Sequence, residues 1–257
     1  MEGSGRRRPD RVEPVRYETY IEHVDSLGSR LAGAAEEALD APVPTCPGWT
    51  VEDVVRHVAE VYEHKIASTE LQHVPDPWPP AWPADRDPVG WFRDAHERLL
   101  AMFHMHKPDD PSPTWWPDDQ TVGFWARRMA HETAIHGADV GHVSGSSTPL
   151  DAELAVDGID EILTIMLAGD WSEAPSPESV GQRVAVIGGD REWVITLEPT
   201  TIGVAEGDGD GVSATIAGDP SDVDLWLWGR APDGAIEVAG AAGDVRLLRE
   251  RLVLATQ

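Results

Sequence analysis

Three features are scarce in this 257-residue sequence, and each scarcity excludes a class of protein. Cysteine occurs once, at Cys46, so no disulfide framework can form within the chain. No run of about 18 apolar residues is present, so no membrane-spanning helix is expected. Acidic residues outnumber basic ones 46 to 20, and a formal charge of −26 would repel nucleic acids and anionic membranes. We therefore expect a cytoplasmic protein that binds neither nucleic acid nor a membrane.

The beginning of the chain differs from the rest. Residues 1–16 contain a run of three arginines but no apolar segment after them, which predicts a disordered arm and no secretory signal. The remainder has a globular composition, with 41% hydrophobic residues overall, and it is long enough to bury a sizeable core.

The first two-thirds of the chain has the apolar spacing of helices. The pattern predicts helices over residues 17–39, 50–71, 89–105, 121–143 and 151–169. Thr50 is expected to cap the second helix, with Asp53 completing a capping box. Proline-rich connections separate the helices. Their tryptophans could line a pocket mouth, although we expect several only to anchor the loops: Trp78, Trp82, Trp115 and Trp116.

The last third reads differently, because short strand patterns alternate with glycine- and aspartate-containing turns. We expect strands at 183–188, 192–199, 201–207, 213–218 and 235–240, and helices at 221–230, with a serine cap, and at 244–255. Residues 170–179 read as a linker. The predicted fold class is α+β: a four-helix bundle over 17–172, followed by a small α+β domain over 180–257.

One segment of the fourth helix, HETAIHGADV at 131–140, carries a candidate site. Glu132 and His136 are four residues apart, so they share one face of a helix, and that face is the apolar, inward one. His131 is expected on the opposite, polar face. An inward carboxylate is costly unless it is paired. The pair is therefore either an internal ion pair or part of a ligand set.

A third group comes from the second helix. His57 borders the apolar stripe of that helix, and it can reach Glu132 and His136 if the two helices are neighbours in the bundle. Two imidazoles and a carboxylate form a three-ligand set suited to zinc, with a fourth position left for water or substrate. The spacing alone leaves this metal site and the ion pair as alternatives.

The segment TCPGWTVEDVVRHVAE, at 45–60, resembles the opening motif of the mycothiol-dependent maleylpyruvate isomerase family, which contains DinB-like bundles. In that motif a proline–glycine–tryptophan turn leads into a helix with a metal-binding histidine, which matches His57. The family's later pair of Glu and His matches Glu132 and His136. The segment DLWLWGR, followed by IEVAG, resembles the family's C-terminal domain. The resemblance covers about residues 17–257.

The resemblance implies a chemistry. A divalent metal, with zinc as the first choice and nickel, cobalt or iron also tolerated, would hold the thiol of mycothiol or a similar small cofactor. The thiolate would attack a small electrophile, either as a cis–trans isomerase or as an S-transferase. Asp139 is expected to orient His136 by accepting its hydrogen bond. The family often has arginine directly after the second histidine, where this chain has Gly137, so the electrophile stays open.

Arg230, at the end of DLWLWGR, is the candidate catalytic and cofactor-binding residue, because a guanidinium can hold a carboxylate of substrate or cofactor in a bidentate pair. The alternative is a solvated cation at a helix end. Cys46 has no basic neighbour in the sequence, and we expect it to be structural.

Two other functions remain open at this point. One is a non-catalytic, metal-containing protein that binds a ligand or acts in resistance or regulation. The other is a metal-dependent hydrolase that uses metal-bound water instead of a thiol. We expect a monomer or a homodimer with a small-molecule electrophile and a thiol cofactor as partners.

Overall fold

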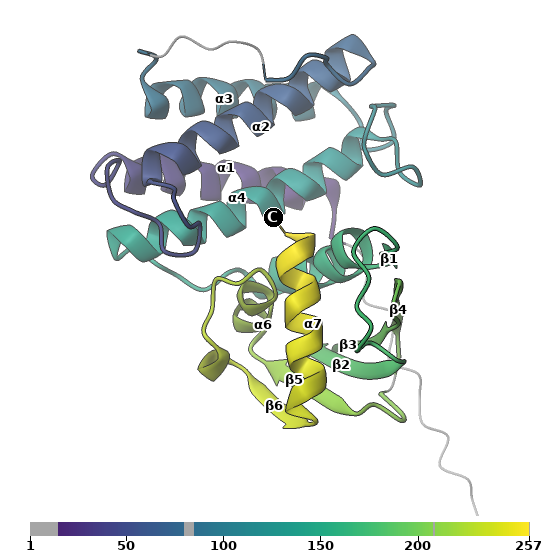
Figure 1. The fold of residues 1–257 in the computed structure, drawn as a ribbon. Helices are drawn as coiled ribbons and strands as arrows, with labels where there is room; N and C mark the ends of the chain where they lie inside the picture. Colours follow the sequence, from purple (N-terminus) through teal and green to yellow (C-terminus); the bar gives the residue numbers. More distant parts are fainter. Residues whose placement is uncertain (1–14, 80–84, 208, 257) are drawn as a thin grey trace, which may run out of the picture.

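The computed structural model describes residues 15–79, 85–207 and 209–256. A helical domain comes first and a small α+β domain follows it, which confirms the predicted fold class (Figure 1). The predicted disordered arm lies outside the described residues except for its last two positions, and Trp82 lies outside them as well. Within the described ranges, no helix combines the length and apolar character needed to cross a membrane.

Four helices form the N-terminal bundle: α1 (Tyr17–Ala35), α2 (Val51–Leu71), α3 (Pro88–Met105) and α4 (Val122–Ser144). α1 packs mainly along α4, and α2 mainly along α3, while α2 also contacts α4. The capping box of Thr50 and Asp53 is confirmed at the start of α2. Apolar side chains such as Val58 and Leu99 are fully buried between the helices, so burial of these faces holds the bundle together.

α5 (Ala152–Glu161) does not continue as the single helix that the sequence predicts over 151–169. It changes into the π-helix η1 (Ile162–Leu167), and strand β1 (Gly169–Asp170) follows. Asp170 pairs with Thr201, so the beginning of the expected linker belongs to the sheet. Apolar periodicity could not reveal this change, because η1 has only 6 residues, too few for the spacing of apolar side chains to distinguish a π-helix from an α-helix.

The sheet has six strands in the order β1-β4-β3-β2-β5-β6. The remaining strands are β2 (Gln182–Gly188), β3 (Arg191–Leu197), β4 (Thr201–Glu206), β5 (Ala214–Gly218) and β6 (Glu237–Gly240). Only the β2–β5 pair is parallel among the strands of this sheet. α6 (Pro220–Leu227), the short 3₁₀ turn η2 (Asp233–Ala235) and α7 (Ala242–Ala255) complete the domain.

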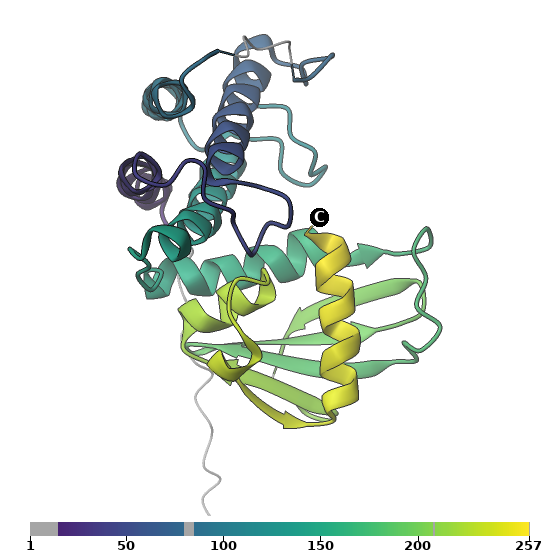
Figure 2. The ribbon, with the colours of Figure 1, turned by 60° about the vertical axis from the view of Figure 1, so that its left-hand side comes forward.

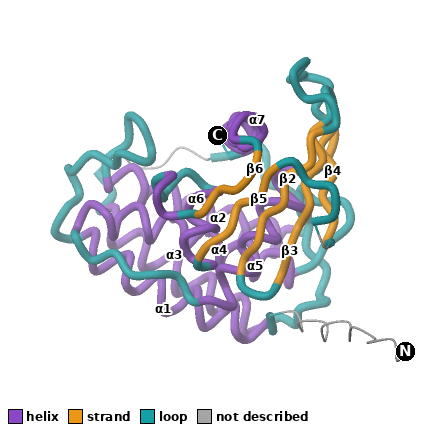
Figure 3. Tube along the Cα trace, turned by 90° about the horizontal axis from the view of Figure 1, so that it is seen from below, coloured by secondary structure: helices purple, strands orange, loops and turns teal. Residues whose placement is uncertain are grey.

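α5, α6 and α7 lie on the face of the sheet that is turned toward the bundle, and the other face is turned away from it (Figures 2 and 3). The cap of α6 is Asp219, whose side chain accepts from the Ser221 amide, rather than the predicted serine. Ser221 instead accepts a hydrogen bond from the Leu150 amide at the end of the bundle.

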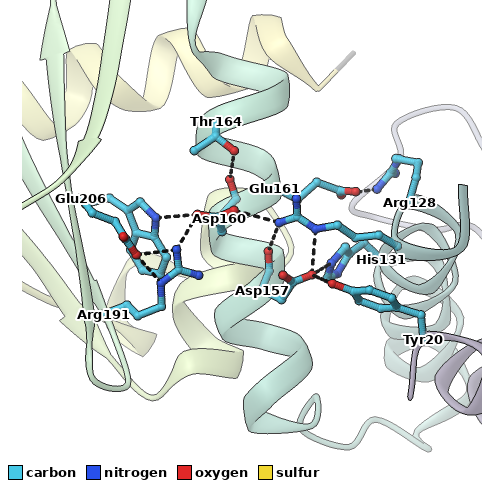
Figure 4. Close-up of polar contacts among 11 residues, drawn as sticks. Tyr20, Arg128, His131, Asp157, Asp160, Glu161, Thr164, Arg191 and Glu206 are labelled. Atoms are coloured by element: carbon cyan, nitrogen blue, oxygen red, sulfur yellow. Dashed lines mark hydrogen bonds and ion pairs between the residues drawn. The ribbon is translucent and has the colours of Figure 1, made fainter. Parts of the chain in front are cut away.

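The two domains meet through a buried polar network centred on Asp157 of α5 (Figure 4). One oxygen of Asp157 lies 2.8 Å from the Tyr20 hydroxyl, 2.9 Å from Nε of Arg127 and 2.7 Å from Nε2 of His131. The prediction of a polar, outward His131 is therefore wrong: the residue is 1% exposed. The face is polar because α5 packs against it with carboxylates, not because it meets water.

The network extends from α5 into the sheet. Asp160 lies 2.9 Å from Nη2 of Arg127 on one side, and on the other it accepts from Arg191 at 2.8 Å and from Nε1 of Trp193 at 3.0 Å. α5 therefore joins the helical domain to the sheet through paired charges on both of its sides.

Candidate metal centre

The structure brings His57, Glu132 and His136 together where α2 faces α4. Nε2 of His57 lies 3.1 Å from Oε1 of Glu132, and Nε2 of His136 lies 3.5 Å from the same oxygen. The two rings meet edge to face, with centroids 5.1 Å apart. One donor atom from each residue lies within 4.8 Å of the other two. Both imidazoles therefore face a single carboxylate oxygen. The His57 side chain is 36% exposed, so the cluster can be reached from solvent on that side.

The other atoms of these side chains are already held. The second oxygen of Glu132 pairs with Arg128, which also pairs with Glu161 of α5. Nδ1 of His136 lies 3.0 Å from Oδ2 of Asp139. If this nitrogen carries the proton, Nε2 is left with a lone pair to donate to a metal. The three facing atoms thus suit a divalent metal with two nitrogen donors and one oxygen donor.

Electrostatics keeps the carboxylates ionised. Burial alone would raise the pKa of Glu132, but Arg128 and the hydrogen bonds of both histidines hold it well below the usual range. Burial also tends to raise the pKa of Asp139, but His136 and Arg230 outweigh it and lower this pKa to about 2. The pKa of His136 rises to about 9 despite its burial, because Asp139 and Glu132 favour the imidazolium in the absence of a metal.

Arg230 occupies a different place from the one expected. α6 ends at Leu227, and Gly229 adopts a left-handed conformation with φ of +80° that turns the chain back. The guanidinium of Arg230 then pairs with both oxygens of Asp139, at 3.1 and 3.2 Å. The Arg230 side chain is only 11% exposed, and the carboxylate that it holds belongs to the protein. Its assignment to a carboxylate of substrate or cofactor stays a prediction.

Sequence reasoning missed two residues at the site. Trp49, in the turn before α2, has its ring 5.1 Å from that of His57 and 6.3 Å from that of His136, so it packs against both histidines. Arg128 lies four residues before Glu132 on the same helical face, and that spacing was the signal that could have identified it. Among the loop tryptophans, Trp78 packs edge to face with His64, at 5.1 Å between centroids, and Trp115 packs on Phe124.

Cys46 lies beside Asp139 and Arg230. With His136 and Asp139 it forms a second group of potential donors, but both Asp139 oxygens are engaged by Arg230. Burial and the neighbouring Asp139 carboxylate raise the pKa of the Cys46 thiol to about 11, although Arg230 opposes them. At neutral pH the group is therefore a protonated thiol rather than a thiolate, which agrees with a structural role.

This pKa predicts slow alkylation of Cys46. At pH 8 the rate constant with iodoacetamide should be at least about 100-fold below that of an unstructured cysteine peptide with a pKa of about 8.5, because the thiolate is the reacting form. The rate should then keep rising up to about pH 11. Mass spectrometry of the single cysteine over a pH series measures it. A rate at pH 8 that equals that of the free thiol would contradict the assignment.

The geometry defines a class of protein: a four-helix bundle that brings two histidines and a glutamate together near its boundary with a small α+β domain. Two family models match the chain in the same order. The mycothiol maleylpyruvate isomerase N-terminal domain matches residues 22–141, and the corresponding C-terminal domain matches residues 153–247. The chain belongs to the mycothiol maleylpyruvate isomerase family, as its motifs indicate. The C-terminal model includes α5, which the sequence analysis grouped with the bundle.

Solved structures agree with this fold. The mycothiol-dependent maleylpyruvate isomerase superimposes with a TM-score of 0.59 at 15% identity, and a His-to-Ala variant of it with a TM-score of 0.60 at 13% identity. Each match covers 89% of this chain and 95% of the other. No curated protein sequence matches the chain.

Proposed function

We propose that the protein is a metal-dependent enzyme that uses a small thiol of the mycothiol type to attack a small electrophile, as an isomerase or as an S-transferase. The observation that carries this proposal is the convergence of His57, His136 and Glu132 through three atoms that engage no other side chain within the described residues. When bound there, a divalent metal would stabilise a thiolate, which a free thiol with a pKa of about 8.5 supplies poorly at neutral pH.

The chain's own residues would hold this site in place. Arg128 fixes one oxygen of Glu132, so that the other stays turned toward the histidines. Asp139 fixes the ring of His136, and Arg230 fixes Asp139 in turn. Trp49 packs against both imidazoles. Such outer contacts set ligand orientation and basicity, so we assign Asp139 and Arg230 to positioning rather than to metal binding.

Zinc is the metal that we propose first, because two imidazoles and a carboxylate with an open fourth position are typical of zinc sites that bind an exchangeable ligand. The family name supports maleylpyruvate isomerisation as the first activity to assay. Gly137 supports keeping S-transfer beside it, because the arginine often found there in the family is missing. A Cβ added at Gly137 would meet no atom within 4 Å, so nothing has filled that space.

Metal content tests the site. Plasma mass spectrometry of purified protein never exposed to chelator should find about one equivalent of metal per chain, and Glu132→Ala should retain less than about a tenth of it. His142→Ala is the matched control, because His142 lies on the same helix but is exposed. Absence of metal from the parent protein, or full retention by Glu132→Ala, would return the cluster to an internal ion pair.

Turnover then separates the alternatives. The thiol enzyme requires added mycothiol, and it returns the thiol after isomerisation but retains it in the product after S-transfer. A metal-dependent hydrolase would act with no thiol present. A metal-containing protein that binds thiol or electrophile without converting either would support the non-catalytic function.

A further inference from the structure

Lysine is rare in this chain. Only Lys65 and Lys107 are lysines among its 20 basic residues. Lys107 is exposed, whereas Lys65 is partly buried on α2, two helical turns beyond His57. A charged side chain turned into a protein normally has a counter-ion, so the surroundings of Lys65 are informative.

Aromatic and imidazole groups surround Lys65. Its Nζ lies 4.5 Å from the centroid of the Trp125 ring and 3.3 Å from Nδ1 of His64. Burial, together with the charge of Lys65, lowers the pKa of His64 to about 4, so His64 is a neutral acceptor here. No carboxylate within the described ranges forms an ion pair with Lys65. The positive charge of Lys65 therefore lacks a directly contacting counter-ion among the described residues.

Most other cations that are buried or half-buried among the described residues have oxygen partners, and Arg249 and Arg251 donate to backbone carbonyls. Arg127, Arg128 and Arg230 each pair with at least one carboxylate. Lys65 has neither kind of oxygen partner within the described ranges, although the chain has 46 acidic residues. Its pKa falls to about 8 for this reason: burial lowers it most, and the nearby charge of Glu132 compensates only in part.

Lys65 faces α4, as His57 does, because its Nζ lies over Trp125 of that helix while His57 contacts Glu132. It follows His57 by eight residues, and its neighbour Trp125 precedes Glu132 by seven, so both helices place it about two turns from the donor cluster. Side chains on a helix lean toward its N-terminus, which turns Nζ back toward His57. The ammonium group is also close enough to feel the charges of both Glu132 and Arg128.

We propose that Lys65 binds a carboxylate of the electrophilic substrate, so that the site selects small, anionic electrophiles. This proposal rests on the proposed function and deepens it. Arg230, the residue first expected to bind such a group, is occupied by Asp139. One uncompensated ammonium matches a carboxylate monoanion, whereas a phosphate dianion would bring an excess of negative charge close to Glu132.

A matched pair of electrophiles tests the proposal. Monomethyl fumarate and dimethyl fumarate share one alkene, and only the first carries a carboxylate. With mycothiol as the thiol, Lys65→Met should lower kcat/KM for monomethyl fumarate at least 10-fold and leave that for dimethyl fumarate within about 2-fold. Lys65→Arg should restore part of the loss. Lys107→Met, the exposed control, should change neither value. An equal loss for both esters, or no loss for either, would overturn the assignment.

A second measurement does not depend on turnover. Reductive methylation with ¹³C-formaldehyde labels the two lysines and the terminal amine, and Lys65→Arg and Lys107→Arg assign the resonances. Adding monomethyl fumarate should shift the Lys65 resonance to saturation and raise its titration midpoint, while dimethyl fumarate should not. A resonance unmoved by the acid overturns the Lys65 proposal even if the enzyme is active. Absence of metal and of turnover with either ester would instead overturn the proposed function.

Discussion

Replacing Asp157 with alanine should lower the free energy of unfolding by about 3 kcal/mol or more, because it removes the shared acceptor of a buried network. The lost carboxylate accepts from the Tyr20 hydroxyl and pairs with Arg127 and His131. Arg127 would keep Asp160, but the ring of His131 would lose its hydrogen-bond partner in a site only 1% exposed to solvent. Urea unfolding monitored by tryptophan fluorescence measures the change.

The control lies on the same helix. Glu153→Ala removes an exposed carboxylate from the first turn of α5, and it should cost no more than about 0.5 kcal/mol. A loss for Asp157→Ala no larger than this would show that the network adds nothing to stability.

The same residue predicts how stability depends on pH. Burial tends to raise the pKa of Asp157, but His131 and Arg127 outweigh it and hold the pKa well below the ordinary value. A depressed carboxyl pKa stabilises the fold fully above the unfolded value of about 4, and the contribution is lost as the pH falls below that. Asp157→Asn should therefore flatten the decline in stability below pH 4 relative to the parent.

The second large effect is expected at Arg128. This arginine is buried between Glu132 of α4 and Glu161 of α5, and it lies 5.5 Å from the centroid of the Trp228 ring. Arg128→Met would leave two buried carboxylates near each other without their cation. The variant should lose about 3–5 kcal/mol of stability in metal-free solution.

A double variant separates charge from packing. Arg128→Met/Glu161→Gln removes one of the two negative charges as well. The free energy of unfolding of this double variant should exceed that of Arg128→Met by at least about 1 kcal/mol. Zinc should also recover stability in Arg128→Met, since a bound metal would neutralise Glu132. Arg93→Met, which breaks the exposed pair with Glu36, should cost no more than about 1 kcal/mol. If neither Glu161→Gln nor zinc restores stability, Arg128 acts through packing alone.

The sequence predicted what depends on local periodicity. The helices of the bundle, the capping box at Thr50 and the short strands follow from the spacing of apolar and turn residues, and the structure has them within a few residues. The four-residue spacing of Glu132 and His136 also placed both on one inward face. Placing His57 beside them required an assumption about which helices pack together, and the family motif supported that assumption.

What the sequence did not predict depends on partners from distant parts of the chain. His131 looked exposed, because its helix alone cannot show that α5 covers that face. Arg230 was considered as a solvated cation at a helix end, because its partner Asp139 lies 91 residues earlier in the sequence. Local periodicity cannot show that the turn at Gly229 brings the two together. The π-helix was not predicted for another reason: its 6 residues are too few for the apolar pattern to show a period different from that of an α-helix.

The way in which α4 is held has a consequence for recombination between relatives. Arg127 and Arg128 of this helix pair with carboxylates of α5, while Asp139 pairs with an arginine from beyond α6. Each of these ion pairs thus takes one residue from the bundle and its oppositely charged partner from the part of the chain that follows. A chimera joining this bundle to the C-terminal half of a distant relative would inherit mismatched charges at its joint, and with them a displaced Glu132 and His136. We therefore expect the charged residues on the two sides of this joint to change together among relatives, even though each domain matches a family model of its own.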